Sequence, residues 1–236
     1  MNTLIQLESS LIGSEEAVVG LENAAKVSLL AVSDSHGNPE ILEEIILAFG
    51  GKCDALVYCG DGAGDLMQTF ADSQRNSRLA SAFPPVIAPV RGNGDGEWYE
   101  HSAVYSGKDG DDKPASFRIN LLPRIIFKAA GRTIFVSHGH YQHIDAGFNT
   151  LRGAAEIMDA DLIFFGHTHR PYRSESGASL LLNPGSCSGP RGGFPPSFAI
   201  VSFPGNTENY TVRFFAIKKT LLGGAGFTQF TPANSV

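Results

Sequence analysis

The sequence predicts an α/β fold built around a parallel sheet. Apolar runs at 27–33, 54–60 and 86–90 have the length and composition of buried strands, and segments of helical length separate them. This β-α-β-α-β order favours a parallel sheet, in which ligands bind beyond the carboxyl ends of the strands. Of the 236 residues, 42% are hydrophobic and 18% are charged, so we expect one globular domain over residues 1–236.

The first elements can be placed from their end signals. Residues 1–25 are expected to form a lead-in that contains a short helix. After the first strand, Asn38 is typical of an N-cap and Pro39 of a first helical position, and this helix is expected to end at Gly50–Gly51. A second, polar helix is expected over about residues 65–80, before the third strand.

The second half of the chain predicts further strands around one helix. Residues 101–118 are polar and rich in turn formers, which predicts an exposed loop and suggests a lid over a site. Two strands flank a turn at Ala130–Gly131, a helix covers about 147–160, and a strand follows at 162–165. Residues 219–236 are expected to form a glycine-rich tail. Antiparallel strands are expected before this tail in the segments SLLLNPGS, PSFAIVSF and YTVRFFAI.

Charge and cysteine usage argue against several classes of function. The net charge is −6, whereas bulk nucleic-acid binding, including that of a nuclease, needs a basic surface. Cys53, Cys59 and Cys187 lack the spacing of a zinc site, so we expect free thiols in a reducing compartment. The start has no signal-peptide pattern, and no apolar run reaches the ~20 residues of a membrane helix. We therefore expect a cytoplasmic protein without membrane contact.

Metal-binding side chains follow five separate predicted strands. They sit beside glycines, which let the backbone turn sharply and approach a site closely. If the strands end at one rim, these side chains converge there. The candidate metal ligands are Asp34, His36, Asp61, Asn93, His138, His167 and His169.

These seven candidates exceed the three protein groups that a catalytic zinc ion takes. They suit two ions if one carboxylate bridges them, and mixed imidazole and carboxylate ligands favour transition metals over Mg²⁺ or Ca²⁺. We expect manganese, with iron, nickel, zinc or cobalt as alternatives. Two ions ~3.5–4 Å apart stabilise in-line displacement at phosphorus, so an acidic chain could bind a small phosphate ester or a nucleotide.

Each motif alone also has a purely structural interpretation. Asp34 and Asn38 could belong to a capped helix start, Asn93 between glycines is typical of a turn, and His138 could be a hydrogen-bonded core histidine. The segment GDGAGD does not match the dinucleotide-binding pattern GxGxxG. The recurrence of such residues at strand ends, in this order, favours the metal site.

The order D-x-H, G-D, G-N, H-G and G-H-x-H resembles the calcineurin-like metallophosphoesterase superfamily. The resemblance runs over about residues 27–215, and NPGSCSGPR (183–191) is similar to the small bacterial and archaeal phosphodiesterase branch. It implies a four-layer α/β/β/α sandwich, the metallo-dependent phosphatase fold, with two mixed sheets flanked by helices. It also implies that Asp61 bridges two ions. The remaining ligands would be Asp34, His36 and His169 at the first ion, and Asn93, His138 and His167 at the second.

The resemblance also implies that the protein is an enzyme of the metal-dependent phosphoesterase class. Within this class, a phosphodiesterase is the first expectation. A hydroxide that bridges the metals would attack phosphorus, with Asp61 and Asn93 as catalytic residues and Asn93 also in contact with substrate. Alternatives are a phosphomonoesterase, a dinucleoside polyphosphate hydrolase, and a protein-interaction scaffold like a eukaryotic membrane-trafficking subunit of the same fold. The complete ligand set argues against a scaffold. The oligomeric state is left open.

One position departs from the pattern of the superfamily. Many members read G-N-H-[DE], and that His is thought to protonate the leaving group, but here the position is Gly94. The departure agrees with the small phosphodiesterase branch and leaves the general acid open. His140 is the first candidate for that role, with Asp95 and His143 behind it. Arg191 is a candidate for binding the substrate phosphate.

Overall fold

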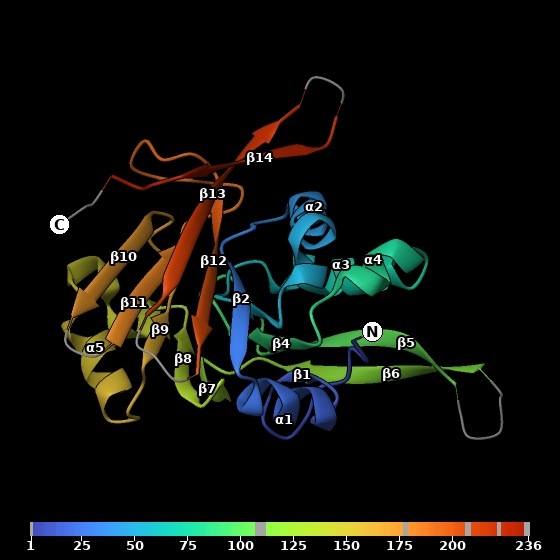
Figure 1. The fold of residues 1–236 in the computed structure, drawn as a ribbon. Coiled ribbons are helices and arrows are strands. Elements are labelled where there is room, and N and C mark those ends of the chain that lie inside the picture. Colours follow the sequence, from blue (N-terminus) through green and yellow to red (C-terminus); the bar gives the residue numbers. More distant parts are fainter. Residues whose placement is uncertain (1, 107–111, 177–178, 206–208, 221–222, 234–236) are drawn as a thin grey trace.

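Two β-sheets lie face to face in the computed structural model, and helices cover both outer sides (Figure 1). The structure describes residues 2–106, 112–176, 179–205, 209–220 and 223–233. Apolar side chains fill three layers, one between the sheets and one beneath the helices on each side. The predicted α/β class and the two mixed sheets flanked by helices are confirmed.

The larger sheet has seven strands in the order β1-β4-β3-β2-β12-β13-β14. Its centre is parallel, because β2, β3 and β4 run in one direction, whereas β1, β12, β13 and β14 are antiparallel to their neighbours. The strands are β1 (Ile12–Gly13), β2 (Lys26–Val32), β3 (Ala55–Tyr58), β4 (Val86–Pro89), β12 (Ser197–Pro204), β13 (Thr211–Lys219) and β14 (Ala225–Phe230).

The smaller sheet has five strands in the order β10-β11-β9-β8-β7. Here β8, β9 and β11 are parallel, and β7 and β10 are antiparallel edge strands. The two parallel cores allow loops at the carboxyl ends of strands from both sheets to approach one another. The strands are β7 (Arg124–Ala129), β8 (Arg132–Ser137), β9 (Leu162–Phe164), β10 (Pro171–Ser176) and β11 (Ser179–Pro184).

The helices begin where the sequence offers caps. Ser14 accepts a hydrogen bond from the Ala17 N–H at the start of α1, and Asn76 accepts one from the Leu79 N–H at the start of α4, each at 3.2 Å. The α-helices are α1 (Glu15–Asn23), α2 (Pro39–Phe49), α3 (Ala63–Ser73), α4 (Ser77–Ala82) and α5 (Asn149–Glu156). Short 3₁₀ turns are η1 (Gly50–Lys52), η2 (His140–Gln142) and η3 (Ile144–Ala146).

Alternating burial along the strands produces the layers. In β2, Leu29 and Ala31 face the other sheet, whereas Leu30 and Val32 pack beneath α2, α3 and α4. On the outer face of the smaller sheet, Phe135 packs in the cluster that includes α5. The order from one side to the other is therefore α/β/β/α.

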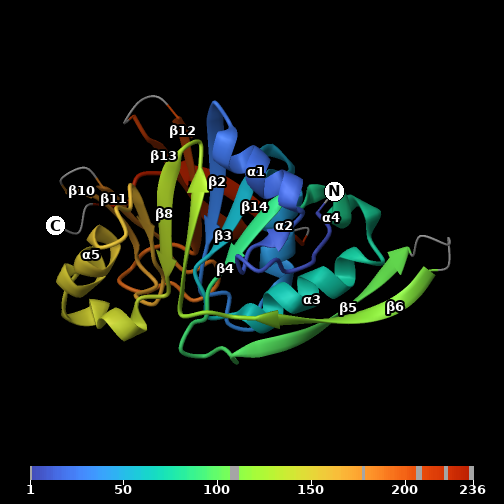
Figure 2. The ribbon, with the colours of Figure 1, turned by 90° about the horizontal axis from the view of Figure 1, so that it is seen from below.

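Residues 101–118 do not form the predicted exposed loop. They belong mainly to an antiparallel ribbon of β5 (Trp98–Ser106) and β6 (Asp112–Asn120), which runs alongside α3 (Figure 2). His101 of β5 is buried, and its ring lies 5.4 Å from that of Phe70 in α3. The polar residues that suggested a loop concentrate at 107–111, which lie outside the described residues.

Three smaller expectations also need correction. The helix expected over about 65–80 is two helices, because Asn76 leaves the helical conformation and caps α4. Asn38 does occupy the N-cap position of α2 and Pro39 begins the helix, but the Asn38 amide donates to carbonyls of the preceding loop and caps no N–H. The expected tail continues the larger sheet as β14 over Ala225–Phe230.

Among the residues that the structure describes, no helix combines the length and the apolar character needed to cross a lipid bilayer. All three cysteines are free and buried, as expected from their spacing. A single domain over residues 1–236 stays a prediction.

Candidate metal centre

The candidate ligands lie on loops at the carboxyl ends of five strands. Asp34, His36, Asp61 and Asn93 follow β2, β3 and β4 of the larger sheet, and His138, His167 and His169 follow β8 and β9 of the smaller sheet. Contacts between the two sets join them at one place: His138 faces Asp61, and His169 faces Asp34. Both sheets therefore contribute to a single cluster.

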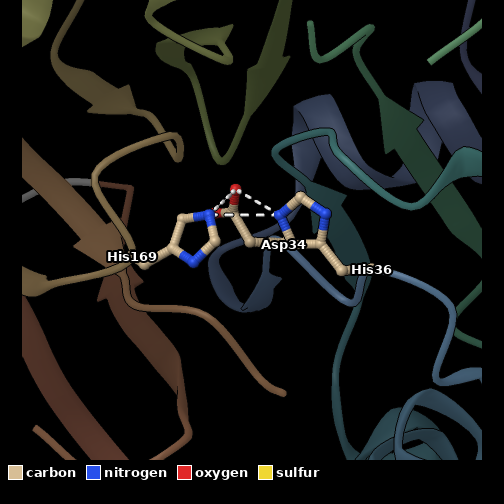
Figure 3. A group of neighbouring side chains, drawn as sticks. All are labelled: Asp34, His36 and His169. Carbon is tan, nitrogen blue, oxygen red and sulfur yellow. Dashed lines mark hydrogen bonds and ion pairs between the residues drawn. The ribbon is translucent and has the colours of Figure 1, made fainter. Parts of the chain in front are cut away.

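Figure 3 shows the imidazoles of His36 and His169 beside the carboxylate of Asp34. Nε2 of His169 lies 3.3 Å from Oδ1 of Asp34 and 3.1 Å from Nε2 of His36. Nε2 of His36 lies 3.8 Å from Oδ1 of Asp34. The Asp34 side chain is fully buried, whereas that of His36 is 42% exposed, so this group opens toward solvent on the His36 side.

A second group combines Asp34 with Asp61 and His138. Nε2 of His138 lies 3.5 Å from Oδ2 of Asp61, 4.0 Å from Oδ1 of Asp34 and 3.2 Å from Oδ1 of Asn93. Asp34 belongs to both groups. Oδ2 of Asp61 also reaches toward the first group, at 3.7 Å from Nε2 of His36. Both carboxylates thus face both groups, and bridging by Asp61 stays a prediction.

His167 is the candidate whose contacts differ most from expectation. Its ring lies 5.1 Å from that of His138, but its Nε2 pairs with Oδ2 of Asp145 at 3.1 Å. A carboxylate on one ring nitrogen fixes the tautomer and leaves the other nitrogen, here Nδ1, with a free lone pair. Asp145, which the sequence analysis did not single out, is therefore a positioning partner for His167.

Two other histidines are oriented by backbone carbonyls. Nδ1 of His138 lies 2.7 Å from the carbonyl oxygen of Cys59, and Nδ1 of His169 lies 2.5 Å from that of Gly189. Donation from Nδ1–H leaves the Nε2 lone pair of each ring directed at the carboxylates. Several hydrogen-bond acceptors then face one another across 3.1–3.5 Å, an arrangement that a cation stabilises.

The Asp34 carboxylate provides the test of whether a cation fits here. Both of its oxygens are buried and have no hydrogen-bond partner. A buried, unpaired carboxylate is costly unless it is neutralised or coordinates a metal. Oxygen and imidazole donors together suit a divalent transition metal. The residues present therefore fit the metal ions that the sequence pattern implies.

Without a metal, these side chains have perturbed protonation equilibria. Burial raises the pKa of Asp34 to about 6, against the opposing charges of His138 and His169. Burial also tends to raise the pKa of Asp61, but His138 and the Gly94 N–H overcome it and hold this pKa at about 2. Burial lowers the pKa of His138, and its contacts with Asp61 and Asp34 outweigh that effect, so the pKa is raised.

Backbone strain gathers at the same residues. Asp34, His36, Asp61, His167 and His169 all have φ between 44° and 68°, the left-handed region that non-glycine residues seldom adopt. Such conformations cost about 1–2 kcal/mol per residue and persist only where the surrounding structure holds them. This signal is invisible in the sequence, and it marks five of the seven candidate ligands.

Asp95 holds two of the ligand loops together. Its carboxylate accepts hydrogen bonds at 2.8–2.9 Å from the backbone N–H groups of Asp61, Gly62, Ala63 and Gly92. The loops approach so closely that a Cβ at Gly92 would lie 2.0 Å from Oδ1 of Asp61. Asp95 is a candidate proton donor from the sequence, but in the structure its carboxylate accepts four N–H groups and holds the two loops together.

Asp65 holds the Asp34–His36 loop in a similar way. Oδ2 of Asp65 accepts hydrogen bonds from the Ser35 hydroxyl and from the N–H groups of Gly37 and Asn38. Two hydroxyls of the segment 183–191 reach the same loop, because Ser186 donates to the Asp34 carbonyl and Ser188 to the Ser35 carbonyl. The segment that resembled the phosphodiesterase branch thus supports Asp34 from the other side.

The remaining predicted residues surround the cluster. The ring of His140 lies 5.3 Å from that of His138, and its Nδ1 is buried without a hydrogen-bond partner. Burial and the neighbouring His138 and His167 lower the pKa of His140 to about 4. Arg191 is exposed, and its N–H donates to the carbonyl of His169. The Gly94 N–H donates to Oδ1 of Asp61 at 2.7 Å.

Comparison with known proteins identifies the family. Residues 27–206 match the calcineurin-like phosphoesterase superfamily domain. The chain belongs to this superfamily. It is 29% identical over 189 residues to the probable metallophosphoesterase YsnB of Bacillus subtilis, covering 80% of this chain and 90% of YsnB. It is 28% identical over 181 residues to the phosphodiesterase YfcE of Escherichia coli K12, covering 74% and 87% of the two chains. The predicted family and the phosphoesterase class are confirmed.

Solved structures agree with this assignment. A predicted phosphoesterase from Streptococcus pneumoniae TIGR4 superposes with a TM-score of 0.56 and 26% identity, covering 87% of this chain and 98% of that protein. Vacuolar protein sorting 29 from Cryptosporidium parvum superposes with a TM-score of 0.57 at 17% identity, over 87% and 98% of the chains. The second likeness concerns the fold alone.

We predict that Asp95→Asn weakens both the fold and the metal site. The amide offers one acceptor oxygen in place of a carboxylate, so charge-assisted bonds to four N–H groups are lost or weakened. The expected loss is about 2 kcal/mol or more of unfolding free energy in urea, with weaker Mn²⁺ binding by calorimetry. The matched control is Asp159→Asn, at an exposed carboxylate whose left-handed φ of 49° asparagine tolerates. An unfolding free energy and a Mn²⁺ affinity of Asp95→Asn equal to those of the parent chain would contradict the anchoring role.

We also predict that Mn²⁺ stabilises the chelator-treated chain more at pH 8 than at pH 5.5. The pKa of Asp34 is raised to about 6 and the pKa of His138 is also raised, so protons compete with a metal for both side chains at pH 5.5. In the metal-free chain, the contribution of Asp34 to stability is present below its unfolded pKa and is lost as the pH rises through its folded pKa of about 6. Above that pH the carboxylate is ionised, and a bound metal ion takes the place of the lost proton. The measurement is the shift in Tm, with Asp34→Asn expected to abolish it. Equal shifts at both pH values would contradict this competition.

Proposed function

We propose that this chain hydrolyses phosphodiesters with two divalent metal ions. The observation that carries the proposal is the convergence of acceptors around Asp34, whose two buried oxygens have no partner. The superfamily and the phosphodiesterase named among the relatives support the same reaction. The expected substrate is a small phosphate ester or a nucleotide, because the acidic net charge of the chain disfavours bulk nucleic-acid binding.

The seven candidate ligands would hold the ions, with manganese as the first expectation. Bound there, the ions would supply positive charge to the phosphate and make water a better nucleophile. The protein side chains would orient this charge: Cys59 and Gly189 carbonyls hold the rings of His138 and His169, and Asp145 holds His167. The exposed amide of Asn93 would donate to a phosphate oxygen, since its Oδ1 faces His138.

Two pockets flank the cluster, and this arrangement favours a diester over a monoester. The first, here the glycine pocket, has a volume of about 230 Å³ and is bordered by His36, Asp61 and Gly94. The second, here the arginine pocket, has a volume of about 430 Å³ and is bordered by Asp145 and Thr168. A diester carries two arms on one phosphate, and each pocket could receive one arm.

Hydrolysis of a phosphomonoester or a dinucleoside polyphosphate remains an alternative within the same chemistry. Gly94 adds no side chain to the glycine pocket, so the general acid found in many relatives of this superfamily has no counterpart at that position. His140 stays a prediction for that role. Its pKa of about 4 would leave it neutral near pH 7, which favours a hydrogen-bonding role and good leaving groups. A cytoplasmic location also stays a prediction.

We predict that Asp61→Asn and His138→Ala each abolish Mn²⁺-dependent hydrolysis of bis(p-nitrophenyl) phosphate. Asp61 faces the imidazoles of His36 and His138, and His138 faces the carboxylates of Asp34 and Asp61, so each change removes a group with two partners in the cluster. Circular dichroism should show that the fold survives, and Asp159→Asn should keep parental turnover. If either variant turned over at near-parental rates with metal present, the proposed site would be wrong.

We further predict that the chain prefers bis(p-nitrophenyl) phosphate to p-nitrophenyl phosphate, measured as kcat/KM with Mn²⁺. Only the diester can occupy both pockets. Chelation should abolish both activities. A scaffold of the kind that shares this fold would instead cleave neither compound with any of the candidate metals, and a preference for the monoester would favour the phosphomonoesterase alternative.

A further inference from the structure

The arginine pocket has features that the hydrolytic reaction itself does not require. Two guanidinium groups, those of Arg170 and Arg191, line it together with the aromatic rings of Phe148 and Tyr172. In a chain with a net charge of −6, two arginines in one pocket are a local reversal of charge. The pocket therefore favours an anionic ligand group that the rest of the surface would repel.

The arginine pocket lies beside the metal centre, because three of the residues that line it contact or adjoin candidate ligands. Asp145, on its wall, pairs with Nε2 of His167 at 3.1 Å. Thr168, also on its wall, stands between the two candidate ligands His167 and His169. The N–H of Arg191 donates to the His169 carbonyl at 3.1 Å. A substrate whose phosphate lies at the cluster would thus extend directly into this pocket.

Neither arginine is neutralised by a carboxylate among the described residues. By contrast, Arg91, Arg132 and Arg173 each pair with an acidic side chain. The one carboxylate on the pocket wall, Asp145, already faces His167. Two guanidinium groups that form no ion pair with a described carboxylate offer up to ten N–H donors, and each planar group suits phosphate oxygens.

Local packing limits the freedom of Arg170. A Cβ on Gly192 would lie 2.9 Å from its Nε, so the side chain rests against a glycine that leaves room for it. The pocket lining also contains Phe148 and Tyr172, whose ring centroids lie 4.7 Å apart. The pocket thus combines charged donors with an apolar face that could contact a sugar or a ring.

We propose that the arginine pocket binds a second phosphate group, carried by one arm of the phosphodiester substrate, through Arg170 and Arg191. The preferred substrate is then a diester with a terminal phosphate beyond the scissile one, such as a phosphorylated nucleotide ester. This specificity rests on the proposed phosphodiesterase function, because the scissile phosphate must lie at the metal centre.

The test compares two substrates that differ only in the distal phosphate. They are the p-nitrophenyl ester of thymidine 5′-phosphate and the same ester with a 3′-phosphate, and both release p-nitrophenolate. The parent chain should cleave the 3′-phosphorylated ester with a kcat/KM about tenfold higher, as expected for at least one charge-assisted hydrogen bond. A ratio of one or below in the parent chain would overturn the proposal.

Variants of the two arginines test whether the arginine pocket causes the difference in kcat/KM between the two esters. Arg170→Ala and Arg191→Ala should each bring the ratio toward one, and Arg170→Lys should keep part of it. The matched control is Arg173→Ala, which removes the same charge from an arginine that pairs with Glu175 on strand β10. Its ratio should equal that of the parent. An unchanged ratio in both Arg170→Ala and Arg191→Ala would overturn the proposal.

A binding measurement separates this proposal from the proposed reaction. Calorimetry with thymidine 5′-phosphate and thymidine 3′,5′-bisphosphate gives the corresponding ratio of dissociation constants without turnover. If neither ester is hydrolysed but the bisphosphate binds about tenfold tighter in an Arg170-dependent manner, the phosphodiesterase function fails and the phosphate pocket stands. Equal affinities for both nucleotides would reject the pocket even in an active enzyme.

Discussion

The Asp34 carboxylate is the constraint on which the rest of the site depends. It is fully buried at the junction of both ligand groups, and neither of its oxygens has a hydrogen-bond partner. A buried anion of this kind is tolerated only when a proton or a metal neutralises it. His138 and His169 face it, but their Nδ1 atoms pair with carbonyls, so their Nε2 atoms present lone pairs. The geometry is thus that of a cation site, and its stability is linked to that cation.

The fold holds this arrangement through backbone contacts. Sheet packing brings loops from strands of two sheets to one place, and two carboxylates then clamp the loops by their N–H groups. Asp65 clamps the loop with Asp34 and His36, and Asp95 clamps the turn at Asp61. These clamps explain why Asp34, His36 and Asp61 keep left-handed φ values that would be unfavourable in isolation. The strained residues and the anchored carboxylates are parts of one preorganised structure.

The sequence was sufficient for some features because their cause is local. Strand-end motifs such as GDG and GHTH carry the ligand types and the glycines in adjacent positions, so the cluster and the α/β layers could be predicted. Other features depend on long-range contacts. The pairing of His167 with Asp145, and the four N–H groups on Asp95, involve residues whose spacing has no periodic signal. The strands β5 and β6 were not predicted because the polar residues of 107–111 dominate the composition of the segment 101–118.

We propose that loops from both sheets hold a pair of divalent metal ions. The most direct test is a crystal structure of the Mn²⁺-loaded chain with an anomalous difference map at the manganese edge. We expect two peaks beside Asp34 and Asp61, one within ligand distance of His169 and the other of His138. Peaks elsewhere on the molecule, or no peak at this cluster in crystals saturated with Mn²⁺, would contradict it.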